Sequence, residues 1–177
     1  MKKETSEYIK ILAERVRATF NVSIPILNID SIIKSMGGDV EEVDAFTCFH
    51  DGTVAKTSDY TFAIRIPKHF ESREERTFVL TKELGHVLLH LGRYTDYACW
   101  SGVPENKFFR FDRYDAEEQA DEFACDFLMP EDEVRSVVAE NVVNGFVNIG
   151  AVADYFNVSK NKAIYRATML SIIGPTF

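Results

Sequence analysis

Long apolar runs are missing from this chain, and their absence limits the classes of protein to which it can belong. No stretch approaches the roughly 20 consecutive apolar residues that a membrane-spanning helix requires. Two lysines follow Met1, but no apolar segment comes after them, so we expect no secretory signal peptide. We therefore expect no association with a membrane.

Cysteine is also scarce, with three residues in a chain of 177. An odd and sparse set does not suit the disulfide framework of a small secreted protein. We expect Cys48, Cys99 and Cys125 to be ordinary small side chains with free thiols, and we expect the protein to be cytoplasmic.

Basic residues are too few to balance the acidic ones, and the net charge is −8. Such a charge argues against general nucleic-acid binding, which depends on contacts to phosphates. Residues 112–133 contain ten acids and one base, a run that we expect to be mostly a solvated face. Residues 141–177 contain three bases and one acid. This shift predicts a main domain at 1–140 and a C-terminal helical appendage at 141–177, packed on it.

Apolar residues make up 46% of the chain, which is enough for a real core. Their spacing predicts an α+β fold, with a helical body and a small, mostly antiparallel sheet within residues 40–66. A turn is expected at Asp51-Gly52, and residues 93–113 look like a loop. The expected helices cover 5–20, about 30–36, 72–91, 115–128, a short segment from about 130, 148–156 and 160–172.

The sequence KELGH at residues 82–86 is the feature with the clearest chemistry. It matches the zinc-peptidase motif H-E-x-x-H, except that the first histidine is replaced by Lys82. The expected general base, Glu83, and the second ligand, His86, are both present. Helical geometry places Lys82, His86 and His90 along one stripe of a helix that is otherwise apolar on both sides. Polar groups on a buried helix need partners.

The helix at 115–128 supplies a candidate partner. Glu117 lies within its apolar face, whereas Glu118 and Glu122 are expected to point to solvent. An inward carboxylate opposite an inward histidine is how a two-helix metal site is built. Taken alone, His90 is expected to be a hydrogen-bonded boundary residue, and His50 and His69 surface residues.

Two longer patterns resemble the ImmA/IrrE family of metallopeptidase domains. The family's first hallmark, F-T-L-A-H-E-L-G-H-x-L-L-H, appears at residues 78–90 as FVLTKELGHVLLH. Its second hallmark, E-x-x-A-[ND]-x-F-A-x-x-L-L-M-P, appears at residues 117–130 as EEQADEFACDFLMP. The resemblance extends from about Tyr8 to Gly174 and implies a zincin-like body.

The resemblance also implies the roles of the site residues. In the family two histidines and the distal glutamate bind zinc, and the motif glutamate activates a water molecule. By position, His86 and Glu117 are the zinc ligands and Glu83 is the catalytic base. Family members that are proteases cleave helix-turn-helix repressors, often encoded beside them in mobile elements or stress loci, and others occur in toxin–antitoxin-like pairs. A repressor-type protein partner is thus expected.

Lys82 is the departure from the family pattern. We hypothesise that its ammonium occupies the metal pocket and pairs with Glu117 or Glu83, so that zinc binding is impaired or lost. The protein would then bind, rather than cleave, a helix-turn-helix repressor. Two alternatives remain open. An active zinc protease could use His86, Glu117 and His90 in a shifted register, and Lys82 could be an introduced or recent change.

The C-terminal helices also look like the family, with A-x-x-F-x-V-S present as ADYFNVS at residues 153–159 and Arg166 on the following helix. The pattern is typical of a helix-turn-helix. Because the segment contains three basic residues in an acidic chain, we expect a packing or partner-recognition element. A DNA-binding regulator is the least favoured of the three functions.

Overall fold

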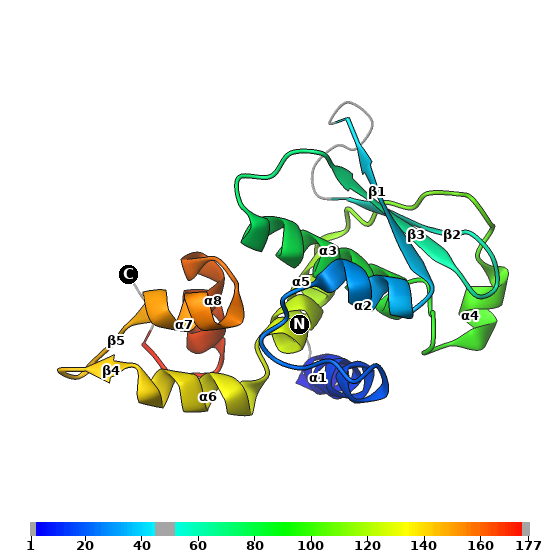
Figure 1. Ribbon diagram of the computed structural model, residues 1–177. Coiled ribbons are helices and arrows are strands. Elements are labelled where there is room, and N and C mark those ends of the chain that lie inside the picture. The colour runs from blue at the N-terminus through cyan, green and yellow to red at the C-terminus, as the bar shows by residue number, and fades with distance from the viewer. Residues whose placement is uncertain (1–2, 45–51, 175–177) are drawn as a thin grey trace.

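The computed structural model describes residues 3–44 and 52–174, and within them the chain forms an α+β fold of eight helices and two small sheets (Figure 1). The predicted fold class is confirmed. Cys48, His50 and Asp51, for which predictions were made, lie outside the described residues. In chain order the elements are α1 (Lys3–Thr19), α2 (Ile29–Ser35), β1 (Gly38–Val43), β2 (Thr53–Lys56), β3 (Phe62–Pro67), α3 (Arg73–Leu89), α4 (Tyr97–Gly102), α5 (Tyr114–Leu128), α6 (Glu131–Glu140), β4 (Val142–Val143), β5 (Phe146–Val147), α7 (Ile149–Phe156) and α8 (Lys160–Met169).

The main sheet is mixed, whereas the sequence predicted a mostly antiparallel one. Its strand order is β1-β3-β2, and the longest pairing is the parallel one between β1 and β3. Only β2 runs antiparallel to β3. The alternating pattern predicted β3 but carried no information on the direction of its neighbours, because side-chain alternation is the same in both kinds of sheet.

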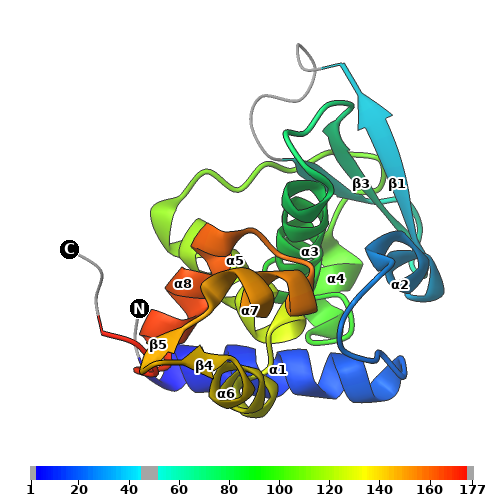
Figure 2. The same cartoon turned by 60° about the vertical axis from the view of Figure 1, so that its left-hand side comes forward.

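Helix α3 is the central element of the fold. Figure 2 shows it between the sheet and α5, with α1 running along the base of the molecule. Every residue from Thr77 to Leu88 is buried, as the two-sided apolar pattern predicted. Ser72 is the N-cap of the helix, and its side chain accepts a hydrogen bond from the amide of Glu75 at 3.1 Å.

Gly85 allows α5 to lie directly against α3. A Cβ atom at this position would come within 3.1 Å of the Phe123 ring and 3.4 Å of the Ala120 Cα atom. The site residues of the two helices therefore face each other across a close contact.

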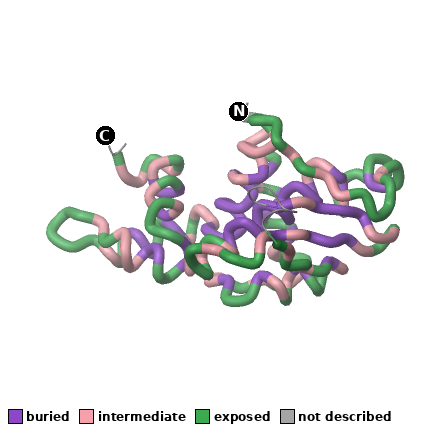
Figure 3. Tube along the Cα trace, turned by 90° about the horizontal axis from the view of Figure 1, so that it is seen from above, coloured by how far each residue is buried: buried purple, intermediate pink, exposed green. Residues whose placement is uncertain are grey.

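The C-terminal helices α7 and α8 contribute residues to the same hydrophobic cluster as the rest of the described chain. Figure 3 shows buried stretches near the C-terminal end of the trace as well as in the main body. Asn157 lies in the turn between them, with a left-handed φ of 54°. Val152, Phe156 and Ala163 belong to that cluster. The helix-turn-helix-like pair expected from the sequence is therefore present.

Several elements differ from the sequence prediction. Helix α4 occurs within residues 93–113, where a loop was expected, and the β4–β5 hairpin lies between the helices expected from about 130 and at 148–156, where no element was predicted. Helix α2, expected from about residue 30, begins at Ile29 with Asn28 as its N-cap, and α5, expected from residue 115, begins at Tyr114. None of the described helices is long and apolar enough to cross a bilayer.

Candidate functional site

The site is formed by the buried stripe of α3 and the inward face of α5. Lys82, Glu83 and His86 are 5%, 3% and 1% exposed, so their polar atoms depend on protein partners. Glu117 of α5 supplies partners for two of them. Lys82 Nζ lies 2.6 Å from Glu117 Oε2, and His86 Nε2 lies 3.3 Å from Glu117 Oε1.

The two contacts of Glu117 differ in kind. The Lys82 contact is a short ion pair between a buried ammonium and a carboxylate that is 33% exposed. The His86 contact is at ion-pair distance but falls short of hydrogen-bond geometry, so the buried Nε2 atom lacks a hydrogen-bond partner among the described residues. The pairing of Lys82 with Glu117 is one of the two that the sequence suggested.

These neighbours determine the charge of Glu117. Burial acts to raise the pKa of this carboxyl, but His86 and the Lys82 ammonium outweigh burial and lower the pKa to about 2. Glu117 is therefore a carboxylate at neutral pH, and the nearest positive charge is on Lys82.

The two histidines on the stripe contact each other rather than converging on one point. His86 Nδ1 lies 3.0 Å from His90 Nδ1, and His90 Nε2 lies 3.2 Å from the side-chain oxygen of Gln119. Burial, followed by the charge of His86, lowers the pKa of His90, which favours a neutral ring. His90 is thus the hydrogen-bonded boundary residue that was expected when it was considered alone.

Glu83 lies on the sheet side of the same helix. A Cβ atom on Gly52, next to the start of β2, would come within 2.9 Å of Glu83 Oε1. Because glycine has no side chain, Gly52 leaves space for the Glu83 carboxylate beside β2. The sequence had assigned Gly52 only to a turn.

A segment that the sequence treated as loop contributes directly to the site. The Phe111 ring stacks on His86, with ring centroids 4.7 Å apart and an interplanar angle of 8°, and its centroid is 5.0 Å from that of His90. The signal that could have indicated this is the concentration of aromatic residues in KFFRF at residues 107–111. An aromatic-rich segment that follows α3 in the chain is consistent with a segment that packs on the site.

Three aromatic residues that follow α3 make other contacts. The Tyr94 hydroxyl donates a hydrogen bond to the Met36 carbonyl, and the Trp100 indole N–H donates one to the Asp59 carbonyl. Tyr97 is 84% exposed. His69 is at the surface, as expected.

The two cysteines within the described residues are both free. Cys99 is exposed, and Cys125 is buried. Burial raises the pKa of the Cys125 thiol to about 12, so that this cysteine is an inert core residue.

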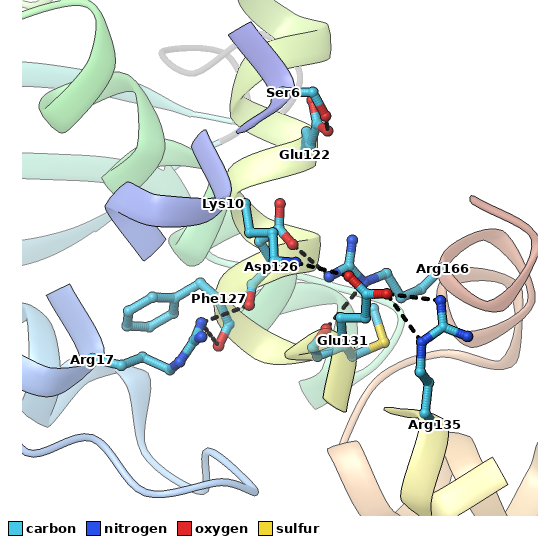
Figure 4. A network of polar contacts seen from close by, with 10 residues as sticks. Ser6, Lys10, Arg17, Glu122, Asp126, Phe127, Glu131, Arg135 and Arg166 are labelled. Atoms are coloured by element: carbon cyan, nitrogen blue, oxygen red, sulfur yellow. Dashed lines mark hydrogen bonds and ion pairs between the residues drawn. The ribbon is translucent and has the colours of Figure 1, made fainter. Parts of the chain in front are cut away.

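Two carboxylates of the acidic run at 112–133 are buried, and one of them corrects a prediction. Glu122, expected to point to solvent, is buried and accepts a hydrogen bond from the Ser6 hydroxyl of α1. Asp126 is buried as well, and it pairs with Arg166 of α8 (Figure 4). A single-helix projection placed Glu122 in solvent because it does not include α1, which packs on α5.

Comparison with known proteins adds a family and a fold. The family model of the IrrE N-terminal-like domain matches residues 40–168, a range that contains all the site residues. No curated protein matches the chain.

Among solved structures, a protein described as a Mycobacterium tuberculosis transcriptional regulator superposes with a TM-score of 0.57 at 14% identity. The match covers 90% of this chain and 46% of the regulator, so the chain spans less than half of that protein's length. At this identity the similarity shows the fold alone.

Proposed function

The chain belongs to the ImmA/IrrE family of metallopeptidase domains, and from this membership we propose that it is a member in which a lysine ammonium has replaced the zinc ion. In this proposal the protein does not cleave its target. It binds a helix-turn-helix repressor-type protein through the former substrate cleft, in the cytoplasm.

The observation that carries the proposal is the 2.6 Å contact between Lys82 Nζ and Glu117 Oε2. Zinc would be bound by this carboxylate, and the ammonium offers the same carboxylate a positive charge from within the chain. A lysine can ligate a metal only after losing its proton, and its charged form repels the ion. The residues of the site as it stands therefore do not fit zinc.

The rest of the donor set is close to a functional arrangement. The 3.3 Å between His86 Nε2 and Glu117 Oε1 matches the separation of about 3.4 Å expected for two tetrahedral zinc ligands with bonds of ~2.1 Å. The buried Nε2 atom without a hydrogen-bond partner among the described residues is also typical of a ligand position. Zinc bound there would supply a polarised, more acidic water. These features support a site that a histidine at position 82 would complete.

The shifted set of His86, His90 and Glu117 finds less support in the geometry. His90 faces Nδ1 of His86, whereas Glu117 faces Nε2. The two groups therefore approach opposite nitrogens of one ring, and no single ion could bind both together with His86. In the described part of the chain, no group of three or more His, Cys, Asp or Glu side chains is arranged to hold a metal.

Binding and cleavage of the repressor-type protein encoded nearest to the gene would test this function. We expect the wild-type protein to bind it in calorimetry and to leave it intact on a gel, with or without zinc. A Lys82→His variant supplied with zinc should cleave it, and a Lys82→His/Glu83→Gln control should not. Cleavage by the wild-type protein, or the absence of any binding, would contradict the proposal.

A further inference from the structure

The free edge of the main sheet is covered by a segment of the chain itself. In the order β1-β3-β2, strand β2 has β3 on one side only. On its other side, the Val54 amide donates to the Phe109 carbonyl at 3.0 Å, and the Phe109 amide donates to the Val54 carbonyl at 2.7 Å. This is an antiparallel bridge, the arrangement by which an extended peptide adds to a sheet edge.

A third backbone bond extends the pairing. The Asn106 amide donates to the carbonyl of Lys56, at the end of β2, at 2.7 Å. Figure 1 shows the connection from α4 to α5 running back beside β2. We call residues 106–111 the strap.

The side chains of the strap alternate as in a strand. Phe108 lies under the Arg65 guanidinium of β3, 3.5 Å from the ring centroid. Phe111, on the opposite phase, stacks on His86. The strap therefore pairs with the sheet edge and places the Phe111 ring against His86 of the candidate site.

The strap is lightly held compared with the elements around it. Asn106, Lys107 and Arg110 are exposed, and the three phenylalanines are half-buried. Beside it lies a surface groove of 470 Å³, lined by Phe109, Phe111 and His90 among other residues. Segments with few buried contacts open more readily than a buried core.

From this geometry we propose that the strap is an internal strand that can be displaced from β2. An extended segment of the partner then pairs with β2 in its place. The inference rests on the proposed function, because it specifies what binds in the former substrate cleft. The incoming segment would form the backbone bonds now made by Asn106 and Phe109, with an aromatic side chain two residues further on against His86.

Charge indicates the chemistry of that segment. The strap contains two basic and three aromatic residues in KFFRF, and the whole chain has a net charge of −8. A partner segment of the same kind is attracted by that field, whereas an acidic one is repelled. The partner segment is therefore an extended peptide of aromatic and basic residues.

A labelled peptide with the sequence PENKFFRFD, copied from residues 104–112, tests the proposal on the full-length protein. The wild-type strap competes with it, so wild-type binding should be weak. Phe109→Pro removes the amide that bonds to Val54, and Phe111→Ala removes the ring on His86. Both variants should bind the peptide at least tenfold more tightly than the wild type by fluorescence anisotropy.

Glu105→Ala is the matched control, because Glu105 is exposed and precedes the paired residues. It should bind the peptide like the wild type, and a scrambled peptide should bind to none of the proteins. Variants that bind no more tightly than the wild type, or that bind the scrambled peptide equally, would overturn the proposal.

Hydrogen exchange of the wild-type protein provides a test that needs no variant. The Phe109 amide should exchange at least tenfold faster than the amides of β3, because the strap opens by itself. Equal rates would mean that the strap opens only when the sheet unfolds, which would also overturn the proposal. If the strap tests fail but the wild-type protein contains no zinc, the proposed function still stands. If the wild-type protein contains zinc, the proposed function is refuted regardless of the result for the strap.

Discussion

At the scale of single residues, Lys82 and Glu117 depend on each other. A buried ammonium without a counter-charge is costly, and so is a carboxylate in a partly buried pocket. Their 2.6 Å contact offsets both costs. Replacing either residue by a neutral one leaves the charge of the other without a counter-charge. The energetic effects of the two replacements are therefore expected to be coupled.

Replacing Lys82 tests this dependence. Lys82→Ala should lower the free energy of unfolding by about 1–3 kcal/mol, less than for a fully buried pair because Glu117 is one-third exposed. Urea denaturation should also show that Lys82→Ala and Glu117→Ala are not additive. Lys68→Ala, at an exposed ion pair with Asp44, is the control and should change stability by less than about 0.5 kcal/mol. A Lys82→Ala protein as stable as the parent would refute the pairing.

The ionisation of Glu117 gives a second expectation. Its folded-state pKa of about 2 lies below the ordinary value of 4.5, so the carboxylate contributes stability that is complete above about pH 4.5 and is lost as pH falls towards 2. Lys82→Met should raise this pKa, which carbon-detected NMR of the glutamate side chain can follow. A wild-type Glu117 that titrates near 4.5 would contradict the assignment.

At the scale of elements, α5 connects α3 to the C-terminal helices α7 and α8. One face meets α3, and another carries the buried Asp126 that pairs with Arg166 of α8 (Figure 4). The Arg166 guanidinium also donates to the Met129 carbonyl at 3.0 Å. Arg166 is thus a structural connection between α8 and the body of the protein.

Removing that connection should have a large effect. Arg166→Ala leaves Asp126 buried without its partner and should cost about 3–5 kcal/mol of unfolding free energy. Arg113→Ala, at a pair exposed on both sides, should cost less than about 1 kcal/mol. Thermal denaturation of the two variants compares them directly, and equal melting temperatures would contradict the structural role of Arg166.

The elements also mark how far the sequence could predict this molecule. The buried α3 and the inward Glu117 followed from helical periodicity, because each depends on one helix and one neighbour. Glu122 was misjudged because its burial depends on α1, which is distant from it in sequence. The strap was read as loop since its pairing with Val54 involves residues more than fifty positions apart, which local pattern does not encode.

At the scale of the whole molecule, the charge distribution argues against DNA as the partner. The net charge is −8, and Arg166, one of the three basic residues in the C-terminal segment, is buried against Asp126. That leaves Lys160 and Lys162 in this segment for phosphate contacts, and Lys162 already lies over the Phe78 ring.

DNA binding should accordingly be absent or non-specific. Fluorescence anisotropy with duplex DNA at about 50 and about 200 mM salt should detect no saturable complex, since neutralising several phosphates requires more exposed bases. Saturable binding that weakens steeply between the two salt concentrations would instead favour a DNA-binding regulator. An unrelated basic DNA-binding protein would serve as the positive control.

Zinc stoichiometry of the purified protein tests the central claim most directly. Elemental analysis should find the wild-type protein essentially without zinc after incubation with the metal, and the Lys82→His variant with about one zinc per chain. His86→Ala in the Lys82→His background should lose it again. One zinc per wild-type chain would contradict the account, because Lys82 could then not have taken the place of the metal.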